Sequence, residues 1–161
     1  MTAAWLAAAA ALGMDARPAG ADEPAAQAHA AERRRERGAR ASIWDGVYTE
    51  AQARRGEYVY PGPCGRCHGV RLNGAPDDPD MLPAPPIAGR KFLRKWDGRS
   101  LAALLEYVRT TMPENNPRSL SDGEYADLVA YMLLVSGAPA GTAELRPEPG
   151  ALSGIEIRNA P

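Results

Sequence analysis

The most constraining feature of this 161-residue chain is the pentapeptide from Cys64 to His68, which reads CGRCH and contains both of its cysteines. Two cysteines cannot build a disulfide framework, and a bridge between residues this close would be strained. A structural zinc ion needs about four ligands, and the other histidine, His29, lies in a charged segment far from the motif. A thioredoxin-like redox pair stays open as an alternative, although the flanking sequence predicts no βαβ unit.

A C-x-x-C-H sequence is the attachment signature of a c-type haem. One helical turn spaces the thiols of Cys64 and Cys67 so that both can bond the vinyl groups of one porphyrin, and His68 then supplies the proximal imidazole to the iron. Only 6% of the residues are aromatic, so a macrocycle would fill a core that the side chains leave small. The sequence therefore predicts one covalently bound haem c.

The sixth ligand of the iron is expected to be a methionine. Pro113 disfavours helical backbone for the residue before it, so Met112 should be extended just after a helix. Met81 lies in an acidic, proline-rich loop and is the minor candidate, whereas Met132 lies in an apolar helix and is interpreted as core. A neutral thioether favours reduced iron and raises its potential, so we expect His68 and Met112 to hold the iron.

Three helices and a long loop are expected in the compact part of the chain, residues 43–137. Each helix begins at a residue that can cap it, and the first and third have the spacing of a capping box. The helices cover residues 50–60, 100–111 and 121–137. The last is apolar on nearly every side over residues 128–135, which predicts burial between two partners, the first helix and the haem. The loop, residues 69–99, holds five prolines and should wrap around the haem.

The two ends of the chain are interpreted from their composition. Residues 1–21 contain an apolar run of twelve residues followed by small ones, which resembles a secretory signal and its cleavage site, although no Lys or Arg precedes the run. Residues 22–42 are charged and predict a flexible linker. Residues 138–161 form a Pro- and Gly-rich tail, in which Ile155 and Ile157 could dock as a short extended piece. A signal predicts a periplasmic protein that is not an integral membrane protein after cleavage.

The net charge of the chain and its local groups of charged residues both bear on the class of partner. The formal net charge is −1, from 19 basic and 20 acidic side chains, which gives no support for a nucleic-acid-binding protein. A basic group in the loop could steer an acidic partner, and a smaller acidic group precedes it, but either could equally be solvated surface. The basic group is Arg90, Lys91, Arg94, Lys95 and Arg99, and the acidic group is Asp77, Asp78 and Asp80.

Four separated motifs resemble those of class I mono-haem c-type cytochromes. In order they are CGRCH, PPIAG from Pro85, TMP around Met112, and VAYM in the last helix. The resemblance covers about residues 43–137 and implies an all-α cytochrome c fold, with three main helices and a long proline-rich loop around one covalent haem. It also implies that the first and last helices cross, with Gly56 of one against Tyr131 of the other.

The same resemblance assigns further residues to the haem. In such cytochromes a loop proline carbonyl accepts the hydrogen bond from Nδ1 of the proximal histidine. Pro86 is the expected match, and Pro85 is the alternative. Such a bond fixes the histidine ring and tunes the iron. Trp96 resembles a tryptophan that contacts a haem propionate, and its alternative role is core packing. Tyr60 matches an aromatic residue that precedes the motif.

The resemblance implies a periplasmic one-electron carrier rather than an enzyme, because iron held by His68 and Met112 has no open position. Its partners would be other redox proteins, a donor dehydrogenase and an acceptor oxidase or cytochrome. Residues 43–48 also resemble small periplasmic cytochromes associated with quinone-cofactor dehydrogenases. Two alternatives stay open. One is a haem-bearing electron-transfer subunit of a dehydrogenase or oxidase complex, and the other is a haem enzyme or sensor with an open iron site.

Overall fold

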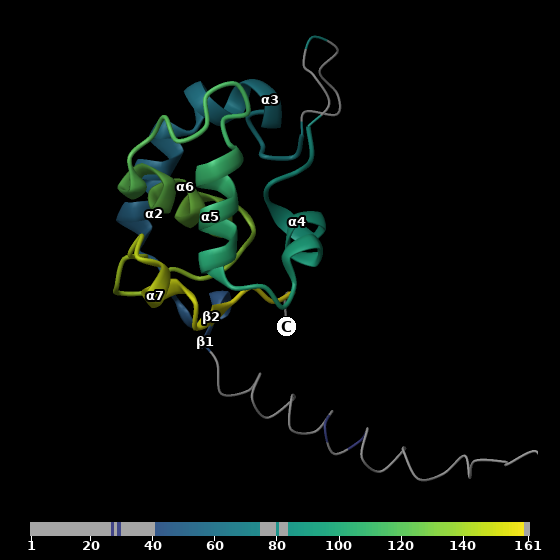
Figure 1. The fold of residues 1–161 in the computed structure, drawn as a ribbon, viewed down its shortest axis with the longest axis vertical. Coiled ribbons are helices and arrows are strands. Elements are labelled where there is room, and N and C mark those ends of the chain that lie inside the picture. Colours follow the sequence, from purple (N-terminus) through teal and green to yellow (C-terminus); the bar gives the residue numbers. More distant parts are fainter. Residues whose placement is uncertain (1–26, 28, 30–40, 75–79, 81–83, 160–161) are drawn as a thin grey trace, which may run out of the picture. The chain divides into compact units, whose positions relative to one another are not determined.

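A computed structural model describes residues 27, 29, 41–74, 80 and 84–159. The chain divides into two compact units, residues 1–37 and 38–161, and the second carries the elements labelled in Figure 1. The predicted signal lies outside the described residues, as do most of the predicted linker and the residues Asp77, Asp78 and Met81. No helix in the described ranges has the length and hydropathy that a bilayer crossing requires.

The second unit consists of helices and one two-stranded sheet (Figure 1). Its elements are β1 (Ala41–Ser42), the 3-10 helix η1 (Ile43–Asp45), α2 (Glu50–Val59), the π-helical turn η2 (Pro61–Gly65), α3 (Arg66–His68), α4 (Gly89–Trp96), α5 (Leu101–Thr111), α6 (Asp122–Val135), α7 (Pro149–Leu152) and β2 (Ile155–Glu156). The strands pair in parallel, with Ala41 opposite Ile155. The three predicted helices correspond to α2, α5 and α6, which confirms the expected all-α class.

Side-chain caps fix where α2 and α6 begin. The hydroxyl of Thr49 accepts the backbone N–H of Gln52 at 3.1 Å, and that of Ser121 accepts the backbone N–H of Glu124 at 3.3 Å. Glu124 completes the predicted capping box, because its carboxylate accepts the N–H of Ser121 at 2.8 Å. The box predicted at Thr49 is only half made. The Gln52 amide turns instead to Leu145, where it donates to the carbonyl at 2.9 Å and accepts from the N–H at 2.7 Å.

Helices α2 and α6 cross at Gly56. A Cβ at this position would lie 2.0 Å from the backbone carbonyl oxygen of Asp127, so only glycine fits. The resemblance placed Tyr131 against Gly56, which stays a prediction, and the structure shows the Tyr131 ring centroid 5.6 Å from that of Tyr60, one turn after Gly56. Arg55 closes the crossing with a bidentate ion pair to Asp127, at 2.9 Å for each bond. The crossing thus combines a backbone contact, an aromatic pair and an ion pair.

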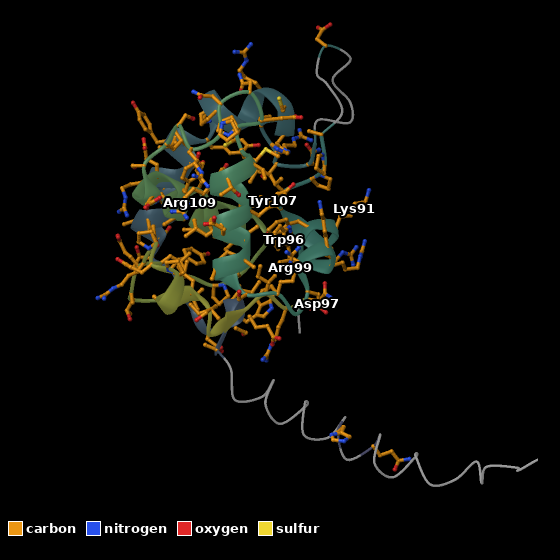
Figure 2. All side chains as sticks on the ribbon, viewed as in Figure 1. Lys91, Trp96, Asp97, Arg99, Tyr107 and Arg109 are labelled. Atoms are coloured by element: carbon orange, nitrogen blue, oxygen red, sulfur yellow. The ribbon has the colours of Figure 1, made fainter. Side chains whose placement is uncertain are left out.

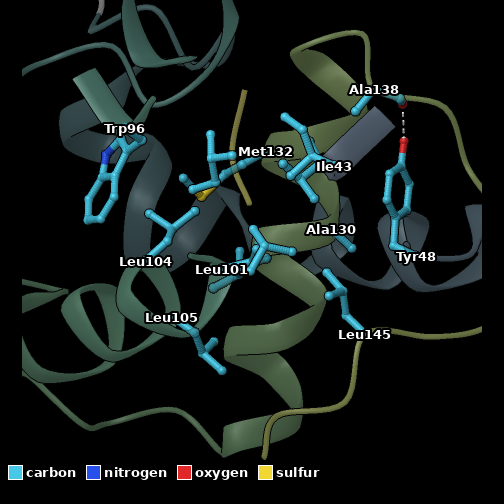
Figure 3. Close-up of a cluster of buried hydrophobic side chains, with 14 of the residues drawn as sticks. Ile43, Tyr48, Trp96, Leu101, Leu104, Leu105, Ala130, Met132, Ala138 and Leu145 are labelled. Atoms are coloured by element: carbon cyan, nitrogen blue, oxygen red, sulfur yellow. Dashed lines mark hydrogen bonds between the residues drawn. The ribbon is translucent and has the colours of Figure 1, made fainter. Parts of the chain in front are cut away.

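The structure corrects the predicted loop over residues 69–99, because its last part forms the helix α4. Phe92, Leu93 and Trp96 are 2%, 1% and 3% exposed and make the inward face of this helix. Figure 3 shows Trp96 near Leu104 and Met132 in the hydrophobic core. Apolar residues at i, i+1 and i+4 share one helix face. The cations between them and the prolines before them concealed this pattern in the sequence.

The C-terminal segment is part of the folded unit, which therefore extends past the predicted boundary at residue 137. Leu145, Leu152 and Ile157 are buried members of the core cluster. The hydroxyl of Tyr48 donates to the carbonyl of Ala138 at 2.6 Å, which is the dashed line in Figure 3. Strand β2 confirms the predicted docking of a short extended piece. A segment rich in Pro and Gly can still bury its few apolar side chains, and composition alone hid this.

Candidate functional site

The CGRCH motif begins in η2 and ends with the three residues of α3. Cys64 is half-buried, Cys67 is exposed, and no disulfide joins them. Burial raises the pKa of the Cys64 thiol to about 11, with a smaller contribution from Cys67, so this thiol is protonated at neutral pH. The backbone N–H groups of Cys64 and Gly65 both donate to the carbonyl of Tyr60, at 3.1 and 3.0 Å. The turn therefore presents two free thiols at the spacing that thioether attachment requires.

His68 is buried at 8% exposure, and its Nδ1 lies 2.8 Å from the carbonyl oxygen of Pro85. A carbonyl oxygen only accepts, so Nδ1 carries the proton and Nε2 keeps its lone pair for a metal. The structure corrects the preferred partner from Pro86 to Pro85, the stated alternative. The reason lies in the register of the segment, because the N–H of Ile87 donates to the carbonyl of Leu72 at 2.9 Å and fixes which carbonyl reaches the ring.

Two anchors hold the segment that carries Pro85. Gly74 approaches this segment so closely that a Cβ would lie 2.1 Å from the carbonyl oxygen preceding Pro85, and its φ of +83° also favours glycine. At the other end, the N–H of Gly89 donates to Oγ of Ser136 at 3.0 Å, and this hydroxyl donates to the carbonyl of Met132 at 2.6 Å. The segment that orients the histidine is thus held at both ends, by the close contact with Gly74 after the motif and by the hydroxyl of Ser136 just after α6.

Replacing Ser136 with alanine should weaken this second anchor. The Gly89 N–H would lose its acceptor, which should lower the free energy of unfolding by about 1–2 kcal/mol. Chemical denaturation of the protein measures the loss. The matched control is Ser153→Ala, because Ser153 is exposed and donates only to the carbonyl of Gly150 at 3.2 Å. The control should lose less than about 0.5 kcal/mol, and equal losses in the two variants would show that the anchor is not special.

Met112 follows α5 with the extended backbone that Pro113 predicted, at φ −126° and ψ 147°. The peptide bond between them is cis. The carbonyl of Met112 accepts the Tyr125 hydroxyl at 2.9 Å, which ties the loop after α5 to α6. Its side chain is half-buried, and ligation of iron by its sulfur stays a prediction. Met132 is buried in the core as expected, whereas Met81, the minor candidate, lies outside the described residues.

Trp96 lies at the end of α4 with its side chain enclosed by three neighbours. Its ring centroid is 5.5 Å from that of Tyr107 and 6.4 Å from that of Phe92. The guanidinium carbon of Arg99 stands 4.2 Å from the Trp96 ring centroid, within the range of a cation–π contact. Figure 2 shows Trp96 and Arg99 close together beside Tyr107 of α5. Core packing of Trp96 is therefore observed, and a propionate contact stays a prediction.

The site's donor groups suit a covalently attached haem. Two free thiols and a histidine with an available Nε2 are the groups that such a haem uses. In the part of the chain that the structure describes, no group of three or more His, Cys, Asp or Glu residues could hold a metal ion.

Comparison with protein families gives a match over about half of the chain. A protein-family model described as "Cytochrome C oxidase, cbb3-type, subunit III" matches residues 51–132. The matched stretch begins in α2 and ends in α6, so it contains Cys64, Cys67, His68 and Met112. Neither the curated proteins nor the solved structures contain a significant match.

Proposed function

We propose that this chain, which belongs to the family described as cytochrome c oxidase, cbb3-type, subunit III, carries single electrons between redox proteins in the periplasm. Membership makes it a c-type cytochrome with an all-α fold and covalently bound haem c, whose function is electron transfer with redox partners. Beyond these family properties, we propose a single haem, iron ligation by His68 and Met112, and no catalytic activity of its own.

The observation that carries the proposal is the bond between His68 Nδ1 and the Pro85 carbonyl, beside a free cysteine pair. When bound, the haem supplies a reversible one-electron change at its iron. The thiols of Cys64 and Cys67 would attach it, and Nε2 of His68 would bind its iron. The carbonyl of Pro85 holds the ring and makes it a stronger donor. We also propose that Trp96 would contact a haem propionate.

Met112 is the second residue that we propose would bind the iron. Its extended backbone and the bond from Tyr125 to its carbonyl hold this segment against α6. A soft, neutral sulfur stabilises ferrous iron relative to ferric iron, which suits a carrier that is reduced readily. If His68 and Met112 both held the iron, oxygen or peroxide would find no open site.

Replacing Met112 with alanine should open the iron to added ligands. The ferric protein should lose the weak far-red absorption band that marks a methionine–iron bond, bind cyanide readily, and show a lower reduction potential. Absorption spectroscopy and a redox titration measure these effects. The matched control is Met132→Leu, a volume-conserving change in the core that should keep the band. A Met112→Ala protein with an unchanged spectrum would exclude Met112, and loss of the band in Met81→Leu would select the minor candidate.

The periplasmic location rests on the apolar run and the small residues within residues 1–21. Haem staining of the denatured protein from a periplasmic fraction tests export and covalent attachment together. Staining found only in the cytoplasmic fraction would contradict the location.

The family description favours a second candidate, a haem-bearing subunit of an oxidase complex. Residues 43–48 point instead to a quinone-cofactor dehydrogenase as donor, on their resemblance alone. Two of these residues, Ile43 and Tyr48, are fully buried, so packing accounts for part of that segment. Size-exclusion chromatography of a native extract separates the candidates. A haem protein that elutes only in a large complex would favour the subunit, and one that elutes at its own mass would favour the carrier.

A further inference from the structure

The outer face of α4 is made of cations. Phe92, Leu93 and Trp96 point inward and are buried, and every other residue of the helix after Gly89 is an exposed Arg or Lys. We call these four residues the basic face of α4; they are Arg90, Lys91, Arg94 and Lys95. Figure 2 shows Lys91 pointing away from the fold, on the outer side of α4.

The charges of the basic face are not balanced within the described fold. None of its four cations has a carboxylate within salt-bridge distance among the residues that the structure describes. Some cations elsewhere are paired, as Arg54 is with Glu50, Arg55 with Asp127, and Arg109 with Glu106 and Asp122. What distinguishes the basic face is that four exposed cations without an ion pair in the described part of the chain lie together on one short helix.

The order of these residues also disfavours the helix that carries them. Arg90 and Arg94 are four positions apart, as are Lys91 and Lys95, and like charges at that spacing repel each other on a helix. Arg90 and Lys91 lie in the first turn, where the positive end of the helix dipole disfavours cations, whereas Arg94 and Lys95 lie in the last turn, where the dipole favours them. Local stability therefore explains only part of this arrangement, whereas binding to a surface of opposite charge would account for all four cations.

The helix α4 follows the candidate haem site at its first end and is tied to the C-terminal segment at its last. Before its first residue, Gly89, comes the segment whose Pro85 carbonyl orients His68. After its last residue, Trp96, the corner is held by two backbone bonds with Ile157. Gly98 donates to the Ile157 carbonyl and Ile157 donates to the Arg99 carbonyl, each at 2.8 Å. A partner bound to the basic face would therefore contact the helix that directly follows the Pro85 segment, which orients His68.

Resting on the proposed electron-carrier function, we propose that the basic face of α4 is the docking surface for an acidic surface on a redox partner protein. Unpaired cations on one face steer an oppositely charged partner and raise its association rate. Redox encounters use small, weak interfaces, and one helix face is of suitable extent. A bilayer is the less favoured occupant, because helices that lie in membranes insert exposed apolar side chains, and the outer face of α4 has none.

The test measures how fast a small acidic redox protein reduces the haem-loaded cytochrome. The probe is flavodoxin in its reduced form, followed by stopped-flow absorption at several salt concentrations. The wild-type rate constant should fall steeply as salt rises, because screening weakens attraction between charged surfaces. The variant Lys91→Glu/Lys95→Glu should be slower by about tenfold or more at low salt and should lose most of the salt dependence.

The matched control is Arg54→Glu/Arg146→Glu, which changes the net charge equally at exposed positions outside α4. The control should keep the rate constant within about twofold. Equal slowing in both variants would overturn the docking surface, because net charge would then explain the effect. Tighter binding of the wild type to vesicles of phosphatidylglycerol than to flavodoxin would overturn it in favour of a membrane. The final extent of haem reduction by excess dithionite should be the same in the wild type and all variants. A wild-type protein that dithionite could not reduce would instead count against the electron-carrier function.

Discussion

Replacing Cys64 and Cys67 together with alanine should abolish covalent attachment of haem. The two thioether bonds are the only covalent links that this site offers, since no other cysteine exists in the chain. Denaturation would then separate the haem from the protein, which axial ligands alone cannot prevent. Haem staining after denaturing electrophoresis and intact-protein mass spectrometry measure the result, and we expect no haem on the variant and one on the wild type.

A matched control lies inside the same motif. Arg66 stands between the two cysteines with an exposed side chain, so Arg66→Ala should keep full attachment. Circular dichroism separates lost attachment from lost folding, because a folded double-alanine variant should keep helical signal. Haem that stays on the denatured double variant would contradict the assignment of both thiols.

Local chemistry made α2, α5 and α6 predictable. Thr49 and Ser121 cap the helices that follow them, and both caps are observed. Pro113 restricts Met112 to extended backbone, which ends α5 where the sequence indicated. These effects depend on residues a few positions apart, so a single sequence is enough to show them.

The remaining features depend on contacts between distant segments. Pro85 rather than Pro86 reaches His68 because Ile87 is held to Leu72, and no periodicity in the loop reveals that register. The anchor at Ser136 was missed for the same reason, since a serine at the end of a helix gives no signal that a loop will bind it. Sequence patterns can mark such residues as polar but cannot name their partners.

The burial of the apolar helix α6 was predicted only in part. Its burial between two partners was expected, and most of its apolar side chains are buried against the rest of the fold. Leu134 and Val135 at its end remain 37% and 41% exposed. The haem as the second partner of this helix stays a prediction.

Replacing Gly56 with alanine should cost about 3 kcal/mol or more in the free energy of unfolding. The added Cβ would meet the Asp127 carbonyl oxygen at 2.0 Å, and backbone atoms cannot rotate aside as a flexible side chain can. The helices α2 and α6 would have to separate, which also strains the Arg55–Asp127 pair and the contact between Tyr60 and Tyr131. Because a domain is stable by only about 5–15 kcal/mol, thermal unfolding should shift downward by about 10 °C.

Intrinsic helix propensity acts in the opposite direction and therefore sharpens the test. Alanine is favoured over glycine inside a helix by about 1 kcal/mol, and this gain offsets part of the cost of the clash. Any stability that Gly56→Ala loses is therefore the part of the clash that remains after the gain. Gly123 in α6 provides the control, because a Cβ there would meet nothing within 4 Å. Gly123→Ala should be neutral or stabilising by up to about 1 kcal/mol. If Gly56→Ala unfolded at the wild-type temperature, α2 and α6 would not cross at the distance that only glycine allows.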